Sequence, residues 1–303
     1  MQINKKKKIA AGLSIASNMT LTALKIAAGI ISGSISIISE AIHSLSDFMA
    51  SVLTFFSVMK SSQPADSDHP YGHGRYEDMA GFIEGVLIIG ASLFIIFESA
   101  RKIIFGLNMD IENNLGITVM FIAVIMNIIV SSILFKVAKD SNSVSLYADG
   151  EHLRTDVYSS LGVFGGLVLI KITGYTLLDP IIAILVAVFI YKTGYNISKK
   201  TMQNLLDHSL PKDDIERIKT VLKQFSDTAK LKKNGIKTRQ IGPTTDLDMV
   251  LQFPENTSIC ECHKICDEIE KEIQIIYPHC SISIHAEPLC YRKNCQKNCD
   301  KNK

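Results

Sequence analysis

Two pairs of a histidine and an aspartate lie inside apolar stretches of the sequence. His43 precedes Asp47 by four residues, and His152 precedes Asp156 by the same spacing. Residues four apart on a helix project from one face, so each pair presents an imidazole and a carboxylate to the same neighbour. Two such helices facing each other would supply the four nitrogen and oxygen donors of a tetrahedral Zn²⁺ site. One pair alone would be unremarkable, but ionisable groups inside apolar spans are costly, so two pairs indicate function.

A second group of metal-ligating residues follows the first pair. Asp66, His69 and His73 lie in a short polar segment that also contains two prolines and two glycines. The pattern Asp-x-x-His-x-x-x-His suits a compact metal site. The alternative is an ordinary polar loop beside a membrane, where charged residues are common. We favour a second metal site in this loop.

The elements that must position the His–Asp pairs are predicted membrane helices. A membrane span needs roughly 20 mostly apolar residues, and beyond about residue 199 no stretch qualifies because charges become frequent. This pattern predicts an all-α, six-helix transmembrane domain over residues 1–200, a cytoplasmic domain over 201–290 and a tail rich in Cys, Lys and Asn over 291–303. The six predicted spans are about 9–31, 35–59, 79–100, 115–138, 147–172 and 177–198.

Basic residues near the ends of these stretches predict the orientation. The run from Lys5 to Lys8, followed by an apolar stretch too long for a signal peptide and without a cleavage site, is typical of a cytoplasmic anchor. Later segments expected inside are also richer in Lys and Arg than those expected outside. We therefore expect a multi-pass protein of the cell membrane, in contact with lipid, with both termini in the cytoplasm.

The polar C-terminal part has alternating helix and strand patterns. Apolar residues recur at helical spacing over 215–225 and 259–276, strands are expected at 235–241 and 246–253, and 281–287 alternates between apolar and polar side chains. The order α-β-β-α-β predicts a small ferredoxin-like domain.

Composition and missing motifs exclude several functions. A net charge of +2 without a basic tract argues against nucleic-acid binding. The sequence has neither the HExxH of a metalloprotease nor a phosphate-binding P-loop, so we expect no enzyme activity and no organic cofactor. The seven cysteines all lie between Cys260 and Cys299, as expected for a reducing compartment. Cys290 lies directly before the tail, and Cys295 and Cys299 lie in it. Capture of a soft metal by these three thiols is a weaker alternative to a simple tail.

Several motifs together resemble those of the cation diffusion facilitator family. They are the two His–Asp pairs on the second and fifth spans, QPADSDHPYGHG at 63–74, ADGEH at 148–152 and TRQIGPT at 238–244. The resemblance covers residues 9 to 290. It implies proton-coupled export of divalent metal ions by a homodimer with a ferredoxin-like cytoplasmic domain.

The resemblance also implies roles for residues outside the spans. The matching loop residues of related exporters form a second metal site. Arg75 resembles a basic residue that pairs with an acid beyond the last span, here Asp207, and an exposed pair without a coupling role is the alternative. Metal ligands expected at the dimer interface of the cytoplasmic domain are Asp248, His263, His285 and Glu287, where relatives carry further histidines that this chain lacks.

The donor types favour one substrate. Imidazole nitrogens favour Zn²⁺ over harder ions, so Zn²⁺ is the expected metal and Cd²⁺ a second substrate. The alternatives are Fe²⁺ or Mn²⁺ as main substrate, or a membrane-anchored metal sensor. Metal binding requires neutral imidazole and ionised carboxylate, so protons are the expected counter-ions.

Overall fold

The structure is a computed structural model that describes residues 2–32, 35–105, 114–173 and 178–289. The chain divides into two compact units, Met1–Leu205 and Leu206–Lys303, which we describe separately. The predicted tail, 291–303, lies outside the described residues. Unit 1 contains the helices α1 (Gln2–Ser32), α2 (Ile35–Ser61), α3 (Arg75–Phe105), α4 (Asn114–Ser141), α5 (Val144–Thr173) and α6 (Leu178–Leu205).

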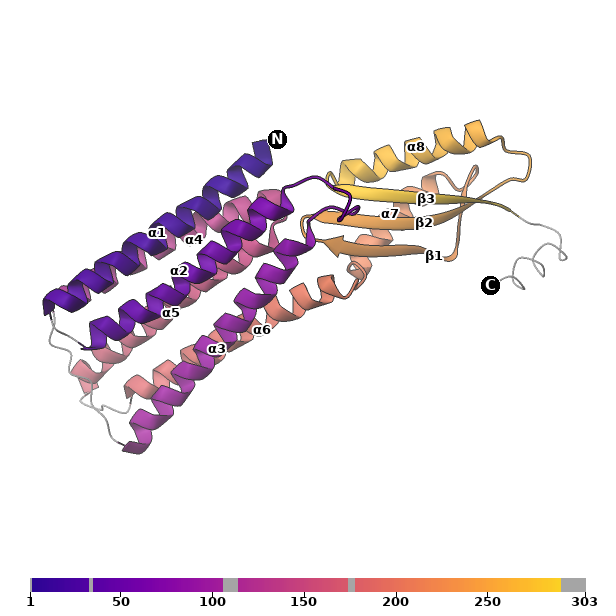
Figure 1. Ribbon diagram of the computed structural model, residues 1–303. Helices are drawn as coiled ribbons and strands as arrows, with labels where there is room; N and C mark the ends of the chain where they lie inside the picture. Colours follow the sequence, from indigo (N-terminus) through magenta and orange to yellow (C-terminus); the bar gives the residue numbers. More distant parts are fainter. Residues whose placement is uncertain (1, 33–34, 106–113, 174–177, 290–303) are drawn as a thin grey trace. The chain divides into compact units, whose positions relative to one another are not determined.

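Helices α1 to α6 run side by side in unit 1 (Figure 1). Within the described ranges, four of them, α1, α3, α4 and α6, are long and apolar enough to cross a membrane. Helices α2 and α5, which carry the His–Asp pairs, stay predicted spans. Helix α6 continues to Leu205, past residue 200, where we expected the membrane domain to end.

The outer surface of unit 1 is apolar, whereas much of its interior is polar. Phe94, Phe97, Phe121 and Leu185 are between 63% and 67% exposed. Many exposed apolar side chains of this size are typical of a region that contacts a membrane or another protein. Buried polar side chains are found on the inner faces of α1, α2, α3 and α5, among them Ser14, Asn18, Asp47, Ser51, Thr54, Glu84, Asp149 and His152.

Helices α3 and α6 approach each other closely at two glycines. A Cβ atom on Gly85 would lie 2.8 Å from the backbone nitrogen of Ser198, and one on Gly194 would lie 2.9 Å from the backbone oxygen of Gly85. Small residues permit such close backbone contact between membrane helices. The contact holds Glu84, the residue before Gly85, in the interior of unit 1, where it is fully buried.

Unit 2 contains a three-stranded sheet covered on one face by two helices. Strands β1 and β2 are antiparallel, β2 and β3 are parallel, and α8 forms the crossover between the parallel strands. The element order is the predicted one, but β1 begins at Lys230 and not at 235. The prediction missed the first half of β1 because this lysine-rich stretch has no alternating apolar pattern. The elements of unit 2 are α7 (Lys212–Gln224), β1 (Lys230–Ile241), β2 (Thr244–Phe253), α8 (Ile259–Ile276) and β3 (Cys280–Pro288).

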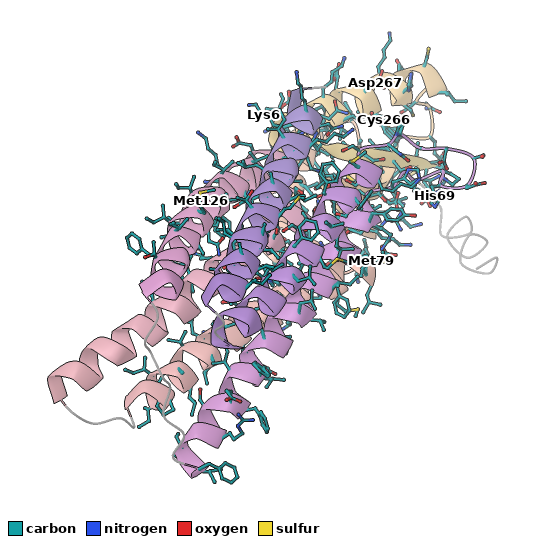
Figure 2. All side chains as sticks on the ribbon, turned by 60° about the vertical axis from the view of Figure 1, so that its left-hand side comes forward. Lys6, His69, Met79, Met126, Cys266 and Asp267 are labelled. Carbon is teal, nitrogen blue, oxygen red and sulfur yellow. The ribbon has the colours of Figure 1, made fainter. Side chains whose placement is uncertain are left out.

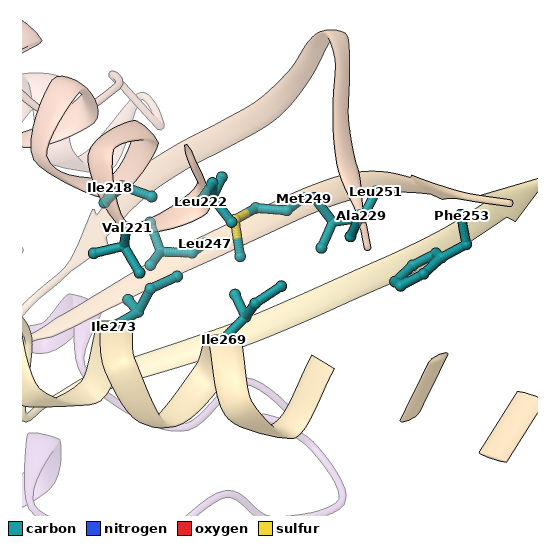
Figure 3. Close-up of a cluster of buried hydrophobic side chains, with 10 residues drawn as sticks. All are labelled: Ile218, Val221, Leu222, Ala229, Leu247, Met249, Leu251, Phe253, Ile269 and Ile273. Atoms are coloured by element: carbon teal, nitrogen blue, oxygen red, sulfur yellow. The ribbon is translucent and has the colours of Figure 1, made fainter. Parts of the chain in front are cut away.

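The core of unit 2 lies between the sheet and its two helices (Figure 3). Ile282 and Ile284 of β3 pack against this core, whereas His285 on the same strand is exposed, which agrees with the predicted alternation. Cys262 and Cys266 of α8 also pack against it, and burial raises the pKa of the Cys266 thiol. The fully enclosed core residues are Ile218, Val221, Leu222, Ala229, Leu247, Met249, Leu251, Phe253, Ile269 and Ile273.

Candidate metal-binding sites

Three of the four predicted ligands of the transport site meet inside unit 1. Asp47 comes from α2, and His152 and Asp156 come from α5; one ligand atom from each lies within 4.8 Å of the others. His152 Nε2 is 3.2 Å from Asp47 Oδ1. Asp47 and His152 are each only 6% exposed, and Asp156 is half-buried. Two carboxylates and an imidazole at these separations can share one divalent ion.

The fourth predicted ligand, His43, lies on α2, but its side chain is outside the described side chains. His43 precedes Asp47 by four residues on the continuous helix α2. The assignment of His43 as a ligand of the transport site stays a prediction.

The loop between α2 and α3 contains a second cluster of metal-ligating atoms. Asp66 Oδ1 lies 3.2 Å from His69 Nδ1, and Asp66 Oδ2 lies 3.3 Å from His73 Nε2. The two imidazole centroids are 4.4 Å apart. Figure 2 shows His69 at the tip of this loop. All three predicted loop ligands therefore come together within 4.8 Å.

Local backbone geometry builds the loop cluster. The backbone N–H of His69 donates to Asp66 Oδ1 at 2.7 Å, and this hydrogen bond holds the pKa of the Asp66 carboxyl below its usual value. Gly72 has φ +80° and donates its N–H to the His69 carbonyl at 2.9 Å, which turns the chain so that His73 folds back onto Asp66. The carboxylate is therefore ionised and placed between the two imidazoles.

The predicted ligands of unit 2 are only partly brought together. Asp248 and His285 line one cleft of about 400 Å³ on the face of the sheet away from the helices. Glu287 lies 3.9 Å from His285 Nε2, and it forms a closer ion pair with Lys232, at 2.8 Å. His263 on α8 lies instead beside Asp267, at 3.6 Å. Within one described chain these residues do not form a three-ligand cluster, so their role stays a proposal.

The predicted partners Arg75 and Asp207 belong to different units. The Arg75 guanidinium donates to the carbonyl of Leu205 at 2.9 Å, at the C-terminal end of α6. Asp207 lies 3.6 Å from Arg239 within unit 2. Arg75 therefore contacts the end of α6, and Asp207 contacts β1. The direct pairing of Arg75 with Asp207 stays a prediction.

Sequence reasoning missed a buried ion pair in unit 1. Lys7, which lies in the run of lysines expected to be a cytoplasmic anchor, is only 2% exposed and pairs with the fully buried Glu77 of α3. Glu77 also accepts hydrogen bonds from Ser61 at 2.6 Å and from Ser143. One carboxylate thus joins α1, α2, α3 and the start of α5. One sequence signal could have indicated that Glu77 is buried: it lies seven residues before Glu84, on the same face of α3.

Comparisons with known proteins agree with this arrangement along almost the whole chain. Residues 12–206 match the family described as "Cation efflux transmembrane domain", and residues 210–289 match "Cation efflux protein, cytoplasmic domain", a dimerisation domain. The "Uncharacterized transporter sll1263" of Synechocystis is 31% identical over 91% of this chain and 89% of its own. The "Cation-efflux pump FieF" of Shewanella oneidensis is 29% identical over 93% of this chain and 94% of its own.

A solved structure also matches part of the chain. It is titled "Mode of Action of a Putative Zinc Transporter CzrB (Zn form)", is 32% identical, and covers 29% of this chain and 98% of its own, with a TM-score of 0.26. The two family matches together extend over both units, and the family consists of cation efflux transporters and not of enzymes. This chain therefore belongs to the cation diffusion facilitator family of membrane transporters.

Proposed function

We propose that this protein exports a divalent transition metal ion, chiefly Zn²⁺, from the cytoplasm across the cell membrane in exchange for protons. The observation that carries the proposal is the convergence of Asp47, His152 and Asp156 within 4.8 Å inside a unit with an apolar outer surface. Buried ionisable groups are too costly to be retained in an anchoring helix without a function. A transported cation is what they are arranged to bind.

The donor set favours Zn²⁺ among the divalent ions. His152 contributes a nitrogen, and His43, four residues before Asp47 on α2, would contribute a second, giving two nitrogens and two carboxylates. Zn²⁺ accepts this mixed tetrahedral set readily, whereas Mn²⁺ prefers sites made of oxygen alone. Cd²⁺ is the expected second substrate. Fe²⁺ or Mn²⁺ as the main substrate is the alternative.

The same ligands explain the exchange for protons. His152 must be neutral at Nε2 to bind metal, and Asp47 must be ionised. The 3.2 Å separation of these two atoms allows them to share a proton when the metal is absent. An arriving ion displaces that proton, and returning protons displace the ion. Movement of the helices would open the site to each side of the membrane in turn.

The remaining features complete the transporter. We propose six membrane spans, α1 to α6, with both termini in the cytoplasm. Unit 2 is proposed to be a ferredoxin-like domain that dimerises with a second copy, with metal bound at the interface by Asp248, His263, His285 and Glu287. The loop cluster of Asp66, His69 and His73 would bind metal at the cytoplasmic side. Pairing of Arg75 with Asp207 would couple the two units.

Counterflow of Zn²⁺ and protons in sealed proteoliposomes tests the function. The full chain should move Zn²⁺ when a pH gradient is imposed, and Zn²⁺ movement should in turn shift the lumenal pH. Replacement of His152 by alanine should reduce both signals to those of protein-free vesicles. Zn²⁺ binding without either flux would instead favour a membrane-anchored sensor.

A further inference from the structure

A second pair of buried carboxylates lies between the Glu77 cluster and the transport site. Glu84 of α3 follows Glu77 by seven residues, or about 10 Å along the helix, and Asp149 of α5 precedes His152 by three residues, or about 4.5 Å. Both side chains are 0% exposed. The Glu84 carboxyl lies within electrostatic range of both Asp149 and His152. The pair therefore adjoins the transport site on the side nearer the N-terminal end of α5.

The oxygens of this pair have few hydrogen-bond partners among the described residues. Glu84 Oε1 accepts a hydrogen bond from the Thr54 hydroxyl, whereas Glu84 Oε2 has no partner. The Asp149 carboxyl interacts with the Ser14 hydroxyl, but neither of its oxygens has a hydrogen bond of ordinary geometry. An unpartnered carboxylate inside a protein is costly, and two of them within range of each other repel. A bound cation would satisfy the free oxygens and offset the repulsion.

We propose that Glu84 and Asp149, with the Thr54 hydroxyl, form a transfer site that holds a divalent metal ion before it reaches Asp47 and His152. This site rests on the proposed function, because it has a role only if metal moves through unit 1. Its donors are all oxygens, which bind Zn²⁺ less firmly than a set containing imidazole. An ion would therefore pass from the oxygen site to the nitrogen-containing site, as conduction through successive sites requires weak enough binding to leave each one.

Counting bound ions tests the site directly. The full chain in nanodiscs would carry Asp47→Asn and His152→Ala, which remove the transport site, and equilibrium dialysis with radioactive Zn²⁺ would count the ions that remain. Adding Glu84→Gln and Asp149→Asn should lower the count by one ion per chain. Glu98→Gln, a neutralisation of a partly exposed residue on the same helix, should leave the count unchanged. An unchanged count in the Glu84/Asp149 variant would show that these carboxylates hold no metal ion and would overturn the proposal.

Flux separates the transfer site from the proposed function. With Asp47 and His152 intact, Glu84→Gln/Asp149→Asn should slow the initial Zn²⁺ flux by at least about tenfold, because replacing groups beside metal ligands commonly costs this much activity. Zn²⁺ should still bind the transport site of this variant. That retained binding also shows that the variant is folded; if the double variant does not fold, the two single variants are measured. If the unmodified protein moves no Zn²⁺, the proposed function fails. If it moves Zn²⁺ and the variant matches it, only the transfer site fails.

Discussion

His152 Nε2 of α5 lies 3.2 Å from Asp47 Oδ1 of α2, although 105 residues separate them in the sequence. Both side chains are nearly buried, so their interaction is poorly screened by solvent. The pair links the two helices that carry the predicted ligands. Replacing either residue should therefore change metal binding, proton exchange and the link between α2 and α5 together.

Replacing the imidazole by a carboxylate should change the preferred metal. His152→Asp converts a mixed donor set into one richer in oxygen, which favours Mn²⁺ over Zn²⁺. We expect the ratio of Zn²⁺ to Mn²⁺ flux to fall by about tenfold or more, equivalent to about 1.4 kcal/mol. Competition between the two ions in proteoliposomes measures the ratio. The same replacement at His208, an exposed residue of unit 2, should leave it unchanged; a similar fall there would contradict the assignment.

Removing Lys7 should destabilise unit 1. Lys7→Ala leaves the fully buried Glu77 without its ion-pair partner, and breaking a buried pair in this way costs about 3–5 kcal/mol. Thermal unfolding in detergent measures the loss, with Lys8→Ala as the control because Lys8 is exposed. The double replacement Lys7→Met with Glu77→Gln should recover part of the stability. Equal unfolding temperatures for Lys7→Ala and Lys8→Ala would show that the pair contributes little.

Two glycines on α3 should respond differently to the same substitution. Gly85→Ala places a methyl group against the backbone of Ser198 on α6, and overpacking of this kind costs about 1–3 kcal/mol. Gly90→Ala has no atom within 4 Å of the new methyl group, so helix propensity should make it neutral or slightly stabilising. Unfolding temperatures of the two variants check the contrast. Indistinguishable values would mean that α3 and α6 do not meet at Gly85.

Metal binding by the loop cluster should depend on the charge of Asp66. The hydrogen bond from the His69 backbone lowers the Asp66 pKa, so this carboxylate stays ionised as the pH falls until that lowered value is reached. The contribution of Asp66 to metal binding should therefore be lost only as the pH falls to that lowered value. Zn²⁺ titrations of the loop at several pH values, compared between the unmodified chain and Asp66→Asn, measure this. Asp66→Asn should bind more weakly at neutral pH, and equal affinities would exclude Asp66 as a ligand.

The sequence predicted which helices carry the two His–Asp pairs, but not how those helices meet. His152 and Asp156 were recognisable because a four-residue spacing within an apolar stretch places them on one helix face. The contact of His152 with Asp47 depends on how α2 and α5 pack, and single-sequence periodicity does not contain that information. The element order of unit 2 was predicted for the same local reason, since Ile282 and Ile284 alternate with polar residues.

The omissions arose where tertiary contacts give a residue a role that local composition does not show. Lys7 lies in a run of four lysines, which predicted an anchor at the membrane surface, and its buried pairing with Glu77 on α3 depends on how the helices pack. Asp149 had no assigned role because its significance comes from Glu84 on another helix. A local pattern shows which face a residue occupies, but not which charged group lies opposite.

Zn²⁺ flux through Asp156→Asn tests the central claim most directly. Asp156 contributes a carboxylate to the cluster of Asp47 and His152, and asparagine preserves its size while removing its charge. Asp140→Asn, at an exposed position near the end of α4, is the control. The account predicts that Asp156→Asn moves Zn²⁺ no faster than protein-free vesicles while Asp140→Asn keeps the flux of the unmodified chain. Undiminished flux through Asp156→Asn would contradict the account.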